Sequence, residues 1–288
     1  MSNKEKSAKL VQKYEDKLRC PICEEQVQVV ELRSLQCANN HSFDFAKQGY
    51  INMLMRSVKT PYDKALFASR QEVIRETNLY TKLHASVADI LKTHLTKEIT
   101  ILDAGCGEGS HLEQIMKKSD LNNMLGIGID IAKEGVLRAA KHYHHAIWLV
   151  GDLANAPLAN QSCNAIINIL SPANYQEFKR ILSEEGIVVK VIPGKNYFRE
   201  LREALYADDK QTYSNEDTVE LFENQFQLIE HMHVQTTESI SEQELEHLIN
   251  MSPLAWNIEE GEKDQLRKHG IDQLTIDLEI LVGKKSDR

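Results

Sequence analysis

Four residues near the start of the chain have the spacing of a metal site. Cys20-Pro-Ile-Cys23 is followed after thirteen residues by Cys37, and His41 comes four residues later. A Cys-x-x-Cys turn places two thiolates on one side of a tetrahedral metal, and a Cys-x-x-x-His segment can supply the other two ligands. Four such ligands leave no coordination position open. The pattern therefore predicts a structural Zn²⁺ site rather than four reduced residues with no shared role.

A second chemical motif is the glycine-rich segment Asp103-Ala-Gly-Cys-Gly-Glu-Gly109. Glycines at 105 and 107 let the backbone turn tightly and approach a ligand without a Cβ in the way. A helix that begins near Ser110 would present unpaired N–H groups to that ligand. The G-x-G-x-G spacing departs from the G-x-G-x-x-G of dinucleotide dehydrogenases. A carboxylate at Asp103 suits the cationic methionine end of S-adenosylmethionine better than it suits a pyrophosphate.

Two further acids follow the glycine loop at places where a nucleotide needs them. Asp130 lies 25 residues beyond Gly105, at the end of the next apolar run, and would accept hydrogen bonds from ribose hydroxyls. Asp152 closes the third run, where an acid can bond the adenine amino group, and Leu153 can cover the ring. A glycine turn by itself would be only a turn, and these acids favour a binding site for S-adenosylmethionine.

The elements that must position these residues alternate between strands and helices. Short apolar runs at 99–103, 125–130, 146–150, 163–170 and 186–192 are separated by amphipathic segments at 111–118, 133–143 and 174–183. This alternation predicts a doubly wound, mostly parallel sheet. Runs at 226–233 and 274–282 would complete it as a terminal pair, and the stretch from about 238 to 269 is predicted helical. The alternation predicts an α/β fold; together with the predicted S-adenosylmethionine site and the cysteine motif, it makes the expected fold class a Rossmann-like class I methyltransferase with a seven-stranded sheet and a small N-terminal zinc-binding domain.

The predicted domain organisation has three parts. Residues 1–54 form a zinc-binding module behind a charged lead-in that is helical or frayed. Residues 55–98 form a connector with helices at 67–76 and 79–95, and residues 99–288 form the methyltransferase domain. Cys106 and Cys163 fall in the glycine loop and in an apolar run, and we predict that both are small packing residues.

Composition sets limits on compartment and partners. The 288 residues are 42% hydrophobic and 27% charged, which is ordinary for a soluble globular protein. No apolar run approaches a membrane span, and the N-terminus has no secretory pattern. Five cysteines with a Cys-x-x-Cys pair indicate a reducing compartment, so the cytoplasm is predicted. The net charge of −9 argues against nonspecific coating of nucleic acid, although residues 1–60 carry ten Lys or Arg against seven Asp or Glu.

In this order, the motifs resemble the bacterial 23S ribosomal RNA guanine-N1 methyltransferases of the RlmA/TlrB type, over nearly the whole chain. The glycine loop is common to many methyltransferases. More specific are the zinc quartet with the run His41-Ser-Phe-Asp-Phe-Ala-Lys-Gln-Gly-Tyr-Ile-Asn-Met-Leu54, and Met251-Ser-Pro-Leu-Ala-Trp256. Gly128-Ile-Asp130 and Pro193-Gly194 also belong to the resemblance.

The resemblance implies a zinc domain that helps to recognise an RNA hairpin and a Rossmann-like domain that binds the methyl donor. It places donor contacts on Tyr80, Gly107, Glu108 and Tyr197. Two departures stand out, because relatives often carry His at the position of Tyr197 and a different linker at 55–66.

The target guanine would have to leave its stack, and its N1 proton requires a base. The sequence does not identify that base. Residues 168–172, after the fourth run, are where we expect the acceptor.

Two other functions stay open at this point. The chain could be a small-molecule methyltransferase with the zinc module as a lid, or a non-catalytic nucleotide-binding zinc scaffold. The oligomeric state, a homodimer included, is equally open.

We predict that Phe43 and Tyr50 form the small core beneath the zinc rather than stack on bases. For other residues the sequence favours neither of two roles. Surface charge and phosphate contact are equally expected for Lys47, Arg56 and Lys59, and Trp256 either lines the target-base pocket or packs against the late helices.

Overall fold

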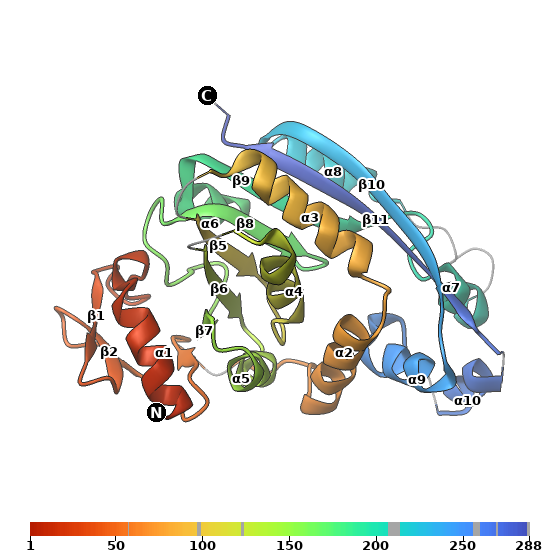
Figure 1. Ribbon diagram of the computed structural model, residues 1–288, viewed down its shortest axis with the longest axis horizontal. Coiled ribbons are helices and arrows are strands. Elements are labelled where there is room, and N and C mark those ends of the chain that lie inside the picture. The colour runs from red at the N-terminus through yellow and green to blue at the C-terminus, as the bar shows by residue number, and fades with distance from the viewer. Residues whose placement is uncertain are drawn as a thin grey trace.

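The computed structural model describes residues 1–286 except 57, 97–98, 122–123, 207–213, 256–259 and 269. A large mixed sheet lies at its centre, and its strands follow the order β10-β11-β9-β8-β5-β6-β7-β4 (Figure 1). Five neighbouring strands pair in parallel, as predicted: β5 (Ile99–Ala104), β6 (Met124–Asp130), β7 (Ala146–Val150), β8 (Cys163–Ile169) and β9 (Leu182–Pro193). Two antiparallel strands, β11 (Gln273–Lys284) and β10 (Gln227–Ser239), complete the far edge.

The sheet has eight strands, so the predicted count of seven is wrong. The additional strand, β4 (Ile51–Asn52), comes from the N-terminal region and pairs in parallel with β7. It covers an edge of the sheet that would otherwise present unpaired backbone groups. A two-residue strand leaves no periodic pattern in the sequence, and only the fold brings it to β7.

Helices cover both faces of the sheet because successive strand residues point in opposite directions. Ile101 belongs to the core on the side of α3 (Thr81–His94), α4 (Ser110–Ser119) and α5 (Lys133–His142). The next residue, Leu102, belongs to the core on the side of α6 (Tyr175–Ile181) and α8 (Glu216–Glu223). Figure 1 shows α3 and α4 in front of the sheet and α8 behind it. The helix α8 and the neighbouring α7 (Arg199–Leu205) were not predicted.

The N-terminal region packs onto the β4 end of this sheet (Figure 1). The lead-in is helical: α1 (Asn3–Gln12) begins with a capping box of Ser2 and Glu5 and buries Ala8 and Val11. A short 3₁₀ turn at Glu15–Lys17 leads to a small antiparallel sheet of β1 (Val27–Val30), β2 (Ser34–Cys37) and β3 (Ser42–Asp44). Phe43 and Tyr50 are 9% and 7% exposed, so both are core residues. Phe43 shares a cluster with Cys20 and Cys37, as predicted, but Tyr50 belongs to the core on the side of α3, α4 and α5, so the predicted small core beneath the zinc is wrong for Tyr50.

The connector and the C-terminal helices meet on one side of the molecule. The connector helix α2 (Lys64–Glu76) packs against α9 (Glu242–Met251), which follows β10. A 3₁₀ turn at Pro253–Ala255 and α10 (Glu260–Lys268) complete the stretch that was predicted helical, except that its first two residues belong to β10. Within the described residues, no helix combines the length and the apolar character needed to cross a membrane.

Candidate functional site

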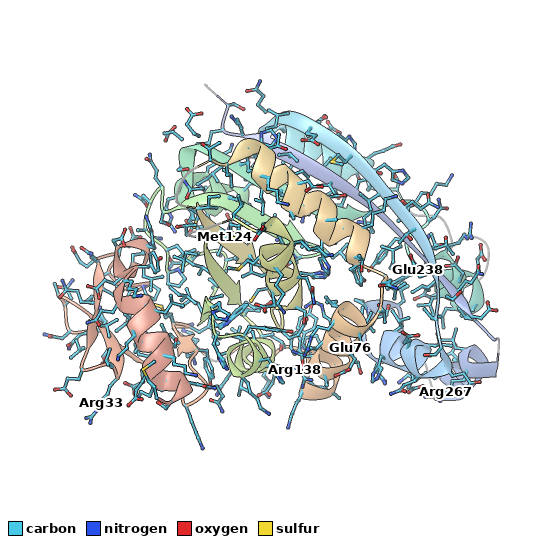
Figure 2. All side chains as sticks on the ribbon, in the orientation of Figure 1. Arg33, Glu76, Met124, Arg138, Glu238 and Arg267 are labelled. Atoms are coloured by element: carbon cyan, nitrogen blue, oxygen red, sulfur yellow. The ribbon has the colours of Figure 1, made fainter. Side chains whose placement is uncertain are left out.

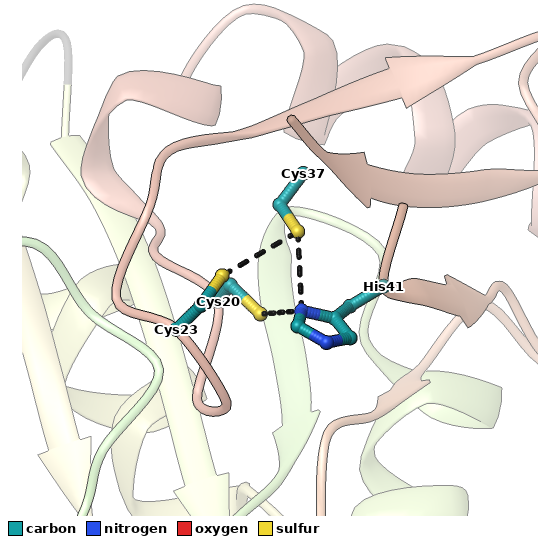
Figure 3. A group of neighbouring side chains, drawn as sticks. All are labelled: Cys20, Cys23, Cys37 and His41. Atoms are coloured by element: carbon teal, nitrogen blue, oxygen red, sulfur yellow. Dashed lines mark hydrogen bonds between the residues drawn. The ribbon is translucent and has the colours of Figure 1, made fainter. Parts of the chain in front are cut away.

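The four predicted metal ligands converge in the N-terminal region (Figure 3). Their ligand atoms all lie within 4.8 Å of one another. The Cys23 and Cys37 sulfurs are 3.6 Å apart, and His41 Nδ1 lies 3.4 Å from Cys37 Sγ and 3.5 Å from Cys20 Sγ. A tetrahedral Zn²⁺ with thiolate bonds of about 2.3 Å requires ligand separations of about 3.7 Å. The three separations given above match this value, so the quartet fits Zn²⁺.

Two tight turns hold the quartet in this shape. The first runs from Cys20 to Cys23, and the N–H of Glu24 donates to the Cys20 carbonyl at 2.9 Å. The second joins β2 to β3, where Asn40 has a positive φ of 62° and the N–H of Cys37 donates to the His41 carbonyl at 3.1 Å. Asn tolerates this left-handed conformation better than most residues.

A cavity of 610 Å³ lies at the carboxyl ends of the parallel strands, and we call it the donor pocket. Ligands of doubly wound sheets bind at this end, outside the strand termini. The walls include seven of the nine predicted donor-binding residues: Tyr80, Gly105, Gly107, Asp130, Asp152, Leu153 and Tyr197. The structure thus gathers these seven on one surface. Asp103 and Glu108 do not line the pocket.

The glycine loop is shaped as the sequence predicts. Gly105 and Gly107 have positive φ angles of 84° and 55°, and α4 starts at Ser110. A Cβ on Gly105 would collide with Ser171, and one on Gly107 would lie 2.5 Å from the Arg70 guanidinium. Both glycines are therefore needed for backbone conformation and for space. At these two glycines the loop packs tightly against Ser171 and Arg70, which line the same pocket.

Asp130 is fixed by the loop that it faces. Its Oδ2 accepts from the N–H of Gly107 at 2.8 Å, and its Oδ1 accepts from the N–H of Ala132 at 2.7 Å. A carboxylate held by two backbone donors keeps further lone pairs for a ligand. Asp152 is similarly anchored, because its Oδ1 accepts from the N–H of Ala154 at 2.8 Å. Both acids stand at the strand ends where the sequence places them.

Asp103 is 2% exposed, and its Oδ2 hydrogen-bonds no other group in the described parts of the chain. Burial raises the pKa of its carboxyl to about 7, against the opposing effect of the nearby Arg70 guanidinium. A buried polar atom without a partner is rare in native proteins and is satisfied where a ligand supplies one. A cationic group bound beside Gly105 would satisfy this carboxylate, which is how the donor set fits S-adenosylmethionine.

Sequence reasoning missed Arg70, a residue of α2 that lines the donor pocket. Its Nη1 donates to Oε2 of Glu108, which is fully buried, while Glu108 Oε1 has no partner among the described residues. Glu108 thus reaches the pocket through Arg70 rather than by lining it. No pattern in the sequence could pair residues 38 positions apart on two different elements.

Tyr80, at the start of α3, and Tyr197, just before α7, both line the pocket, and their hydroxyl oxygens lie 2.7 Å apart. Burial raises the pKa of Tyr80 to about 12, so its phenol stays protonated. Tyr197 follows a turn fixed by Asp277, whose Oδ2 accepts from the N–H of Asn196 at 2.7 Å. His111 adds an edge-on contact to Tyr80, with ring centroids 5.1 Å apart. A tyrosine at position 197 is therefore tied into the pocket wall.

The predicted acceptor segment borders the same pocket through Leu170, Ser171 and Pro172. Asn168 is buried and donates to the carbonyls of Ala104, at 2.6 Å, and of Pro172, at 3.2 Å. Lys190, on the adjacent strand, donates to Asn168 Oδ1 at 2.5 Å and to the Ser171 carbonyl at 2.6 Å. Burial lowers the pKa of Lys190 to about 8. This lysine, which the sequence did not single out, locks the segment in place.

Comparison with known proteins shows that the zinc quartet and the donor pocket occur together in one protein family. Residues 18–59 match the zinc-ribbon family model described as "RlmA, N-terminal", and residues 101–190 match "Methyltransferase domain". The chain is 35% identical, over 93% of its length and 96% of the relative's, to "Putative 23S rRNA (guanine-N(1)-)-methyltransferase YxjB" of Bacillus subtilis. The chain belongs to the 23S rRNA (guanine-N1)-methyltransferase family. A Streptomyces fradiae member, "23S rRNA (guanine(748)-N(1))-methyltransferase", is 26% identical over 92% of this chain and 95% of its own.

Membership of the methyltransferase family decides against the dinucleotide dehydrogenase alternative. The end of α9 and the segment that follows it supply a further part of the wall of the donor pocket. Met251, Ser252, Pro253 and Leu254 line it, and Tyr206 donates from its hydroxyl to the Leu254 carbonyl at 2.9 Å. Trp256, which ends the same motif, lies outside the described residues. The Met-Ser-Pro segment therefore faces the pocket, and the predicted alternatives for Trp256 are untested.

Proposed function

We propose that this protein transfers a methyl group from S-adenosylmethionine to N1 of a guanine in a hairpin of 23S ribosomal RNA. The observation that supports the proposal is the union, in one chain, of the zinc quartet and the donor pocket. That chain aligns along 93% of its length with a relative whose name specifies this reaction. We place the reaction in the cytoplasm and the RNA beside the zinc module. A homodimer stays a prediction.

The residues of the donor pocket suit the parts of S-adenosylmethionine. Asp103 does not line the pocket, but its buried and unpartnered carboxylate oxygen would favour the cationic methionine end nearby. Asp130, in the pocket wall, offers oxygens to the ribose hydroxyls. Asp152 and Leu153 stand where the adenine would lie. The donor supplies an electrophilic methyl group on a sulfonium, and the protein's own task is to hold the acceptor in line with it.

The acceptor would enter beside Leu170, Ser171 and Pro172. Lys190 donates to the Ser171 carbonyl and to the Asn168 side chain, and Asn168 donates to the Pro172 carbonyl. The protein therefore presents a rigid surface to the base. Rigid placement of two reactants supplies much of a rate enhancement when the chemistry is a single displacement. The group that removes the N1 proton stays unidentified, because no side chain in the described pocket wall is singled out for that role by contact or distance.

Transfer of a tritiated methyl group from labelled S-adenosylmethionine tests the proposal directly. The substrate is 23S rRNA from a strain that lacks the enzyme, with 16S rRNA as the control. We expect incorporation into 23S rRNA alone, a primer-extension stop at one guanine, and 1-methylguanosine in the nucleoside digest. Incorporation into small metabolites but not into RNA would instead establish the small-molecule alternative. Failure to bind S-adenosylmethionine would leave the non-catalytic scaffold.

A further inference from the structure

A hollow of 350 Å³ lies between α1, α2 and α5, and we call it the basic hollow. Its lining includes the cationic side chains Lys47, Lys64, Arg138 and Lys141, with the ionisable His142 beside them and a single acid, Glu134. These residues come from all three parts of the chain: the zinc module, the connector helix and the methyltransferase domain. Figure 1 shows α5 between α1 and α2, and Figure 2 labels Arg138 on the lower edge of α5.

The positive charge of the basic hollow is not neutralised by the protein. Lys47, Lys64 and Lys141 are exposed, and none of them has an ion-pair partner in the part of the chain that is described. Burial and then the charges of Arg138 and Lys141 lower the pKa of His142. Like charges that outnumber the acids among them repel one another and cost stability. In a chain of net charge −9, this concentration indicates an anionic partner.

The basic hollow borders the donor pocket. Lys64 lines the hollow, while Leu66 and Phe67, in the same first turn of α2, line the donor pocket. On α5, Glu134 lines the hollow, and a Cβ on the next residue, Gly135, would lie 2.8 Å from the Gly107 backbone and from the Phe67 ring. One polyanion could therefore occupy the hollow while one of its bases enters the pocket.

We propose that the basic hollow binds the phosphate backbone of the RNA strand whose guanine enters the donor pocket. This inference rests on the proposed function and adds the surface that holds the substrate. Contacts to phosphate set the register and orientation of a nucleic acid without reading its sequence. The zinc module, through Lys47, and α5, through Arg138 and Lys141, would together fix the strand relative to the donor.

The test replaces Lys47, Lys64 and Lys141 together by glutamine, because all three are exposed and none supports the core. Methylation kinetics on a 23S rRNA hairpin are measured at several salt concentrations. Each phosphate contact on a single strand contributes about 0.7 to the slope of log affinity against log salt, so losing three lowers the slope by about 2. We expect KM to rise at least about tenfold at low salt with kcat unchanged.

The matched control replaces Lys92, Lys117 and Lys118 by glutamine, which removes the same charge from α3 and α4. Its KM and salt slope should equal those of the wild type. Both triple variants should bind S-adenosylmethionine with wild-type affinity by calorimetry, which verifies the donor pocket. An unchanged KM and slope in the hollow variant, or an equal change in the control, would overturn the inference while methylation by the wild type stands.

If the wild type methylates no RNA, the proposed function fails, and the hollow is then tested by binding alone. Fluorescence anisotropy with the same labelled hairpin measures affinity for the wild type and both variants. Loss of binding in the hollow variant only would support an RNA-binding surface. Equal RNA binding by all three proteins would refute it. Binding to anionic lipid vesicles is measured in parallel, and a hollow variant that loses vesicle binding but still binds the hairpin would also refute the RNA-binding surface.

Discussion

Replacing Arg70 by methionine should destabilise the protein, because it leaves a buried carboxylate unpaired. Glu108 is fully buried and the Arg70 side chain is 18% exposed, so the variant leaves a buried carboxylate without its counter-charge. Removing one partner of such a pair costs about 3–5 kcal/mol. We expect a loss of about 3–5 kcal/mol at pH 7.5.

Urea unfolding at pH 7.5, without methyl donor, compares the free energy of unfolding of the variant with that of the wild type. Arg75→Met is the matched control on the same helix, since Arg75 is 40% exposed and, among the described residues, pairs with exposed Glu76; its effect should stay within about 0.5 kcal/mol. Combining Arg70→Met with Glu108→Gln should recover most of the loss. A penalty below about 1 kcal/mol would refute the role of the buried pair.

Four further outcomes follow from the same geometry. Because burial raises the pKa of Asp103 to about 7, affinity for the cationic donor should fall as the pH drops below 7, and Asp103→Asn should abolish this dependence in calorimetry. Cys37→Ser should eliminate bound zinc in elemental analysis and lower the melting temperature; retained zinc would exclude the quartet. Tyr197→Phe leaves the buried Tyr80 hydroxyl without its 2.7 Å partner and should cost about 1–3 kcal/mol in thermal unfolding, and adding Tyr80→Phe should restore part of it. Lys190→Met should reduce kcat about tenfold or more with donor affinity unchanged, since it releases the acceptor segment; an unchanged kcat would count against this positioning role.

The sequence predicted those parts of the site that depend on local chemistry. The zinc quartet needs only two short motifs, and the turns between them are the ones that such motifs form. The glycine loop and the acids at the ends of two strands were also predictable. In a parallel sheet these strand ends share one edge, so Gly105, Asp130 and Asp152 had to lie together.

The parts that sequence reasoning missed depend on contacts between distant elements. Arg70 belongs to an ordinary amphipathic helix, and only the packing of α2 beside the glycine loop gives it Glu108 as a partner. In the sequence, Lys190 is only an unusual charge in a buried strand. The structure explains it, because Asn168 and the Ser171 carbonyl lie within hydrogen-bonding distance. Glu108 was expected to touch the donor, but it is buried behind the pocket wall and pairs with Arg70.

The sequence by itself determined the family, the four residues of the zinc quartet, the order of strands along the chain and the glycine loop that lines the pocket. These features follow from residue types at short, fixed spacings, where local conformation decides which atoms meet. The tertiary structure alone decided that β4 adds an eighth strand, that Arg70 and Lys190 become buried partners, and that lysines from three regions form the basic hollow. Such features arise when elements far apart in the chain pack together, and burial then sets which charges must pair and which stay free for a partner.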